Sequence, residues 1–216
     1  RQFNKISTTK YDQKISNKTF KEEDLINFLK FFDPDQPKVS GNWNKWQHKR
    51  DIAILYFIYA TGLRVSEVLQ FNFSDLPFEE QIKVVGKGMK ERYIPIIPVV
   101  NKKIYEYILA LKAESNLEIL SSDPLFIKIT KNKVSNLTPR DIQRNMKKLI
   151  NIYPGQIPSE ATPHSLRHSF ATHLIQNGLN IRKIQKLLGH ASIDTTQLYT
   201  NLDDEYLKKA YDEVQN

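Results

Sequence analysis

Residues 162–200, TPHSLRHSFATHLIQNGLNIRKIQKLLGHASIDTTQLYT, contain the start and stop signals of three short helices. Thr162 is a good N-cap, and Pro163 suits the first helical position, where a missing N–H has no cost. Apolar residues then recur at helical spacing up to Gly178, a residue type that is common just past a helix end. The same reasoning predicts a second and a third helix, with boundaries at Asn180, Gly189 and Ser192.

Four polar side chains in this stretch stand where they could meet one another. His164 and Arg167 are three residues apart, so they share one face of the first helix and can contact one small anion. His190 follows a glycine stop, where a loop side chain can point back toward the same place. Tyr199 lies about two turns into the third helix, roughly 10 Å from its start. Together they offer the cations, neutral donors and hydroxyl nucleophile that a phosphate ester requires.

Another arginine stands at the start of a predicted helix further upstream. A core helix that contains the apolar run 52–60 ends at Gly62, and Arg64 opens a short helix through Phe71. A positive charge at a helix start opposes the helix dipole, and a bound phosphate would offset that cost. The alternative is a surface arginine that pairs with Glu67, one turn further on.

Residues 81–97 read as two strands joined by a Gly-Lys-Gly turn. The two glycines free the backbone, so that Lys87 can project from the tip of the hairpin. A lysine in this position could donate a proton to a bound substrate, or it could be an ordinary exposed turn residue. Lys90 and Arg92 lie nearby and could be confused with it.

These motifs, taken in register, resemble those of the tyrosine site-specific recombinases, the phage integrase superfamily, and in particular the bacterial Xer-type enzymes. The resemblance covers residues 20–216. It rests on the following segments: Ala60-Thr-Gly-Leu-Arg64-Val-Ser-Glu67, Val85-Gly-Lys87-Gly-Met-Lys-Glu-Arg-Tyr-Ile-Pro, His164-Ser-Leu-Arg167-His-Ser-Phe-Ala-Thr-His-Leu, Leu-Leu-Gly-His190, and Tyr199 nine residues later.

The resemblance implies a mainly α fold with a small antiparallel β-hairpin or sheet, the α+β architecture of a tyrosine recombinase catalytic domain. We expect residues 19–216 to form that domain and residues 1–18 to be a linker or arm following an absent N-terminal core-binding domain. A solvated lead-in is the alternative for residues 1–18. Residues 203–215 read as an amphipathic tail helix. In relatives this helix docks on a neighbouring protomer; the alternative is that it packs on its own domain.

The resemblance also implies a mechanism and assigns it to six catalytic residues: Arg64, Lys87, His164, Arg167, His190 and Tyr199. The tyrosine would attack the scissile phosphate and form a 3′-phosphotyrosyl link, while the two arginines hold the non-bridging oxygens. The lysine would protonate the leaving 5′-oxygen. His164 would assist proton transfer, and His190 would donate to the phosphate. This chemistry implies neither a metal ion nor ATP or another cofactor.

Composition agrees with a nucleic-acid partner. The 216 residues carry a formal net charge of +8 and have a pI near 9.4, which favours a polyanion, although solubility alone would also explain it. The absence of cysteine excludes disulfides and thiolate metal sites, and no apolar run has membrane-spanning length. Together with this composition, the resemblance implies a cytoplasmic, nucleoid-associated protein that binds double-stranded DNA. It further implies a homo- or hetero-tetramer on paired sites, with exchange of C-terminal helices.

The sequence is also open to three other functional interpretations. The spacing of His164, His168 and His173 could suggest zinc, but there is no H-E-x-x-H arrangement and no cysteine. A non-catalytic helix-turn-helix DNA-binding module would also be basic and built of short helices. A type IB topoisomerase-like enzyme would share the chemistry. The motifs favour site-specific recombination, either in chromosome dimer resolution or in integration and excision of a mobile element.

Overall fold

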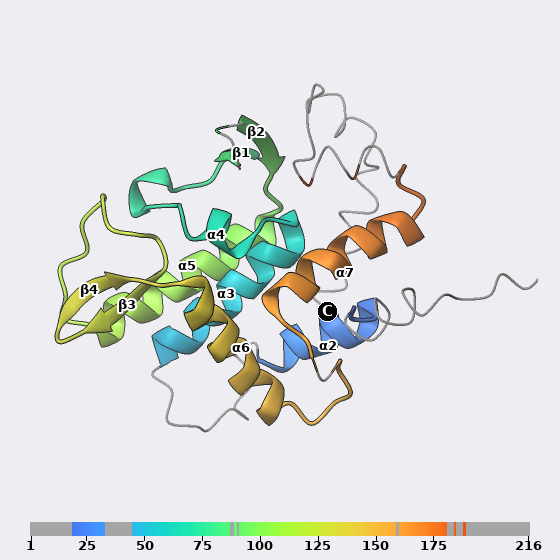
Figure 1. Ribbon diagram of the computed structural model, residues 1–216. Helices are drawn as coiled ribbons and strands as arrows, with labels where there is room; N and C mark the ends of the chain where they lie inside the picture. The colour runs from blue at the N-terminus through green and yellow to red at the C-terminus, as the bar shows by residue number, and fades with distance from the viewer. Residues whose placement is uncertain are drawn as a thin grey trace, which may run out of the picture.

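The computed structural model describes residues 19–32, 45–86, 89, 91–158, 160–180, 184 and 188. These residues form helices and two small antiparallel sheets (Figure 1), which confirms the predicted mainly α fold. The helices are α2 (Glu22–Phe31), α3 (Lys45–Thr61), α4 (Val65–Val68), α5 (Pro98–Glu114), α6 (Pro139–Ile152) and α7 (Pro163–Gln176), with a short 3₁₀ turn at Phe73–Asp75. Several predictions fall outside the described residues: Lys87, His190, Tyr199, residues 1–18 and the tail helix 203–215.

Helix α3 is the centre of the molecule, and α5 and α7 make the largest contacts with it (Figure 1). Seven consecutive residues, 52–58, are buried, so the helix is apolar around its whole circumference at this point. A helix of this kind is stable only when neighbours cover every side. The predicted core helix is therefore confirmed. At its C-terminal end, the turn at Gly62 packs against Phe170 of α7.

The predicted hairpin consists of β1 (Gln81–Val85) and β2 (Glu91–Pro95), paired antiparallel. Side chains alternate between the two faces, and Ile82, Val84 and Ile94 point into the core. Arg92 occupies the remaining inward position, opposite Val84. The pleat therefore places one arginine on the apolar face of the hairpin. A second hairpin consists of β3 (Ile127–Thr130) and β4 (Lys133–Asn136).

Helix α7 begins and ends where the sequence predicted. Pro163 is its first residue, the Thr162 N–H donates to Ser165 Oγ at 3.1 Å, and Gly178 follows the helix with φ of +86°. The segment before α2 is tied to the same helix, because the Phe20 N–H donates to Ser169 Oγ at 2.9 Å. Two stretches that are about 150 residues apart in the chain are thus held together by a buried hydrogen bond.

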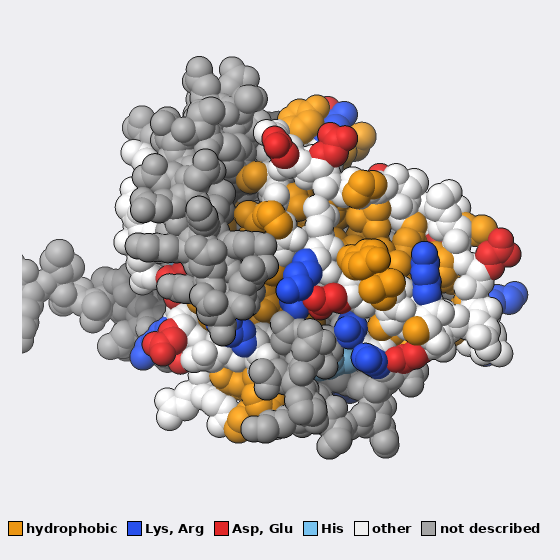
Figure 2. Space-filling model, turned by 180° about the vertical axis from the view of Figure 1, so that it is seen from behind, with side chains coloured by type: hydrophobic (Ala, Val, Ile, Leu, Met, Phe, Trp, Pro, Cys, Tyr) orange, Lys and Arg blue, Asp and Glu red, His pale blue; other side chains and the backbone are white. Residues whose placement is uncertain are grey.

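The surface on the side opposite to the view of Figure 1 mixes basic, acidic and hydrophobic side chains (Figure 2). Within the described part of the chain, no helix is both long and apolar enough to cross a membrane.

Candidate functional site

Arg64 precedes α4 in an extended conformation, and its pairing with Glu67 is the one that the sequence suggested. Its backbone N–H donates to Glu67 Oε2 at 2.8 Å, and its Nη1 donates to Oε1 at 3.0 Å. The arginine side chain is nevertheless 41% exposed. The guanidinium therefore has an anchoring partner on one side and retains accessible surface with which to contact an anion.

Arg167 reaches the same place from α7. It is buried, its Nη1 donates to the Gly62 carbonyl, and its Nη2 donates to the Leu188 carbonyl at 2.7 Å. The Nη1 atom also lies 3.9 Å from Glu67 Oε2. The two arginines that the sequence assigned to phosphate binding thus converge on one carboxylate, although they come from helices more than 90 residues apart.

Gly62 makes this convergence possible. Its φ is +64°, a conformation that L side chains rarely adopt, and an added Cβ would lie 2.4 Å from Phe170 Cδ1 and 2.8 Å from Leu188 Cδ2. The turn after α3 can therefore pack directly against α7 and present its carbonyl to Arg167 only with glycine at this position.

A third guanidinium, that of Arg92, binds Glu67 with both of its Nη atoms. Nη1 lies 3.1 Å from Oε1 and Nη2 lies 2.8 Å from Oε2. Both side chains are buried, with 8% and 4% of their surface exposed. We call Arg64, Arg92, Arg167 and Glu67 the arginine cluster. Three guanidinium groups face one carboxylate, so the cluster has an excess of two positive charges, which favours an anionic ligand.

The pKa shifts within the cluster reflect burial and charge. Burial, and then the nearby charge of Arg64, lower the pKa of Arg167 to about 10, so the group stays protonated at neutral pH. Burial would raise the pKa of Glu67, but hydrogen bonds from Arg92 and from the Arg64 backbone outweigh it and hold the pKa below its ordinary value. Arg167 and Glu67 are therefore both charged at pH 7.

His164 lies in the first turn of α7 and remains accessible to solvent. Partial burial, followed by the charges of His168, Arg167 and Arg64, lowers its pKa. The rings of His164 and His168 meet edge to face with centroids 4.4 Å apart. A neutral imidazole beside two arginines can accept or pass on a proton, which is the role that the sequence predicted for it.

His173, which entered the zinc interpretation by its spacing, has a structural role. Its Nε2 is 2.9 Å from the Phe20 carbonyl oxygen, and its Nδ1 is 3.0 Å from the Tyr59 hydroxyl. Both ring nitrogens are therefore engaged in the interior, and neither is available to a metal ion. His168, in contrast, is exposed on another face of the helix.

The structure thus brings together Arg64, His164 and Arg167, while Lys87, His190 and Tyr199 lie outside the described residues. Sequence reasoning missed Arg92, which it treated only as a neighbour of the hairpin lysine. Strand alternation could have found it, because Arg92 stands two residues before the buried Ile94 and so shares its face.

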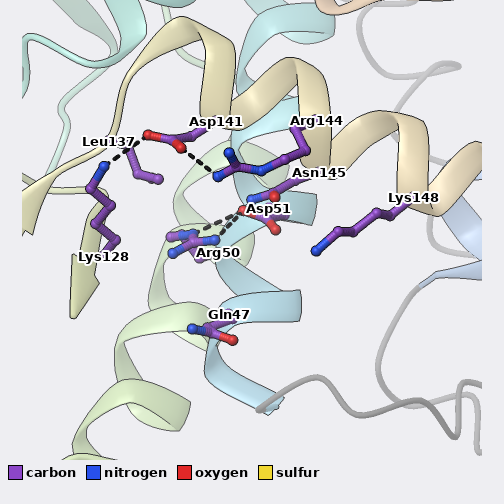
Figure 3. A pocket seen from close by; sticks show the side chains of 9 residues that line it. All are labelled: Gln47, Arg50, Asp51, Lys128, Leu137, Asp141, Arg144, Asn145 and Lys148. Carbon is purple, nitrogen blue, oxygen red and sulfur yellow. Dashed lines mark hydrogen bonds and ion pairs between the residues drawn. The ribbon is translucent and has the colours of Figure 1, made fainter. Parts of the chain in front are cut away.

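A pocket of about 290 Å³ lies elsewhere, between α3, α6 and β3 (Figure 3). Five of its charged side chains are paired with one another: Arg50 with Asp51, and both Lys128 and Arg144 with Asp141. Burial raises the pKa of Asp51 even though Arg50 opposes the shift. Asp51 and Thr61 stand ten residues apart on α3, a rise of about 15 Å, so this pocket is separate from the arginine cluster.

Residues 22–206 match the phage integrase family. This chain belongs to that family. The match includes α2 to α7 and extends past Tyr199, and it confirms the resemblance that the motifs indicated.

Individual relatives agree. The chain is 39% identical over 168 residues to tyrosine recombinase XerC of Rhodospirillum centenum, which covers 77% of this chain and 47% of that protein. It is 37% identical over 198 residues to XerC of Rickettsia canadensis, which covers 92% of this chain and 60% of that protein. The chain therefore spans about half the length of these relatives.

The fold also resembles that of a solved recombinase. The crystal structure of XerH site-specific recombinase bound to palindromic difH substrate, a post-cleavage complex, superposes with a TM-score of 0.64 at 26% identity, over 97% of this chain and 56% of that one. The tyrosine recombinase catalytic fold that the sequence predicted is thereby confirmed.

Proposed function

We propose that the chain is the catalytic part of a site-specific DNA recombinase, which cleaves and rejoins double-stranded DNA through a 3′-phosphotyrosyl intermediate. The observation that carries this proposal is the convergence of Arg64 and Arg167 on Glu67, beside His164. The XerH recombinase that this fold resembles is described as bound to its difH substrate. We infer that DNA is likewise the polyanion that this cluster binds.

The arginine pair would bind the scissile phosphate. A guanidinium offers parallel N–H donors that match two phosphate oxygens, and it keeps its charge at any physiological pH. Charge develops on the non-bridging oxygens as the nucleophile attacks, so donors already held in place lower the barrier. Removing one such donor typically costs about 10²–10³ in rate.

The remaining steps move protons and exchange bonds. The Tyr199 phenol, whose ordinary pKa is about 10, loses its proton as it attacks phosphorus. The bond to the 5′-oxygen breaks, and Lys87 protonates that oxygen. His164 assists proton transfer and His190 donates to the phosphate. Because the phosphotyrosyl bond conserves the energy of the phosphodiester, the 5′-hydroxyl of a partner strand can reverse the step without a metal ion or ATP.

The larger assembly belongs to the same proposal. Residues 19–216 form the catalytic domain and residues 1–18 a linker from a core-binding domain. Four protomers, identical or of two kinds, act on paired DNA sites and exchange their tail helices 203–215. The protein acts in the cytoplasm on DNA of the nucleoid, in chromosome dimer resolution or in integration and excision of a mobile element.

A covalent-trapping experiment tests the proposed function. A DNA site is first selected by its binding to the full chain from random-sequence duplexes, and a nick is then placed next to the scissile phosphate so that the cleaved end diffuses away. We expect a protein–DNA adduct that survives denaturation, and no adduct with Tyr199→Phe. An adduct with Tyr199→Phe would refute the nucleophile assignment. Binding without any wild-type adduct would instead indicate a non-catalytic DNA-binding module.

A further inference from the structure

Arg92 binds the carboxylate of the arginine cluster through both of its Nη atoms, yet it is too deeply buried to contact DNA itself. Only 8% of its side chain is exposed, and both of its Nη atoms are bound to Glu67. We propose that Arg92 is a positioning residue: through Glu67 it holds Arg64 and Arg167 in the geometry that binds the scissile phosphate. This proposal rests on the proposed function.

The contacts show how the effect would be transmitted. Two hydrogen bonds from a planar guanidinium fix both the position and the rotation of the Glu67 carboxylate plane. The same two oxygens accept from the Arg64 backbone N–H and Nη1. Oε2 also faces Arg167 Nη1 at 3.9 Å. Any rotation of the carboxylate would therefore displace the contact that anchors Arg64.

The charge balance points the same way. Without Arg92, Glu67 would be shared by two arginines and would hold each of them more tightly. With Arg92 bound to both of its oxygens, the carboxylate is largely neutralised, and the half-exposed Arg64 is left with positive charge to offer an anion. The Arg92 Nε is buried and has no acceptor among the described residues. An unsatisfied buried donor costs stability, and a role in positioning the other arginines would explain why it is kept.

A buried ion pair that only stabilised the fold would be the simpler explanation. Buried pairs, however, are weak evidence for stability, because desolvation of the two charges offsets most of their attraction. The two explanations differ in one measurable respect. A purely structural residue affects every substrate alike, whereas a residue that aligns the arginines affects only substrates whose phosphate charge needs them.

The test compares Arg92→Gln and Arg92→Lys with wild type in single-turnover adduct formation on the nicked duplex. One substrate has an ordinary scissile phosphate, and the other has a methylphosphonate, in which a methyl group replaces a charged non-bridging oxygen. Lys83→Gln is the control, because the Lys83–Glu91 pair joins the same two strands at 2.8 Å but is exposed.

We expect Arg92→Gln to slow adduct formation on the phosphate about 10²-fold, the usual effect of a small misplacement of catalytic groups. The decrease on the methylphosphonate should be much smaller, and Lys83→Gln should resemble wild type on both substrates. Arg92→Lys keeps the charge but not the planar fork, so it should show a milder version of the same selectivity. If circular dichroism shows that Arg92→Gln does not fold, the Arg92→Lys variant alone is compared with wild type.

Three results would overturn the role of Arg92: wild-type rates in both variants, equal losses on the two substrates, or a loss that disappears when the leaving 5′-oxygen is replaced by sulfur. The last result would place Arg92 with the group that protonates the leaving oxygen. If wild type itself forms no adduct while still binding DNA, the proposed function fails, and the role of Arg92 fails with it.

Discussion

At the scale of the residue, Glu67 is the group on which the arginine cluster depends. Its side chain is 4% exposed, and it is the only carboxylate that the described residues place among the three guanidinium groups. The neighbouring sequence offers Glu67 one obvious partner, Arg64, and the tertiary fold adds Arg92 and Arg167. A single acidic side chain thus keeps three arginines together against their mutual repulsion, so that an anion can add to the arrangement rather than be required for folding.

Glu67→Gln should therefore reduce both stability and activity. Removing the charge leaves Arg92 and Arg167 buried without a counter-charge, which should lower the free energy of unfolding by about 3 kcal/mol. Urea denaturation measures the loss, and adduct formation should fall in parallel. Glu91→Gln, in an exposed pair on the same hairpin, is the control and should change little. A fully stable Glu67→Gln variant would contradict the account.

His173 predicts how stability depends on pH. Burial lowers its pKa below the ordinary value of 6.5, although the hydrogen bond with Phe20 opposes this. The unfolded chain therefore binds a proton more readily than the folded one. Stability should be greatest above pH 6.5 and fall as the pH is lowered toward 5. Unfolding midpoints in urea at several pH values measure the effect.

His173→Gln keeps a donor for the Phe20 carbonyl but cannot titrate, so it should flatten this slope. The pKa of His164 is lowered as well, so His164→Gln should remove a further part of the slope. The carboxylates whose pKa values are lowered, Glu67 and Asp141, titrate below this range. An unchanged slope in His173→Gln would show that the buried imidazole is not its origin.

At the scale of the element, the turn between α3 and α4 sets the distance between the two arginines of the predicted site. Gly62→Ala would force a Cβ into the ring of Phe170 at a φ of +64°. We expect a loss of about 1–3 kcal/mol in unfolding free energy from the strained backbone, with more from the clash. The Arg167 contact with the Gly62 carbonyl should also be displaced, and adduct formation should slow.

Gly178→Ala is the matched control for this substitution. Gly178 also has a positive φ, +86°, but no atom of the described residues lies within 4 Å of an added Cβ. It should show the backbone penalty alone and leave adduct formation unchanged. Equal effects of the two substitutions would mean that the contact between the turn and α7 contributes nothing.

At the scale of the whole molecule, the net charge of +8 should govern how tightly the protein binds DNA. Lysine and arginine side chains release counterions from the phosphates that they neutralise. The logarithm of the binding constant should therefore fall linearly with the logarithm of salt concentration, by about 0.9 for each phosphate contacted. Fluorescence anisotropy of a labelled duplex between low and physiological salt measures this slope. Binding that does not depend on salt would contradict a phosphate-based interface.

Much of the architecture follows from local order in the chain. The caps and stops of α7, the apolar run of α3 and the glycines of the β1–β2 turn are patterns within about twenty residues, and each predicted its element correctly. The motifs around Arg64 and Arg167 likewise indicate the family without any tertiary contact, and the family match confirms it. Local sequence was sufficient there because helix ends, strand alternation and motif spacing are properties of neighbouring residues.

The arrangement of the arginine cluster depended instead on packing. Arg92 and Glu67 are 25 residues apart, and Arg167 and Gly62 are 105 apart. Nothing in the spacing selects these partners, since a buried charge pairs with whichever counter-charge the fold brings within reach after water is removed. The amino-acid order therefore determined which side chains could bind a phosphate, and the meeting of α3, α4, β2 and α7 decided how they are held.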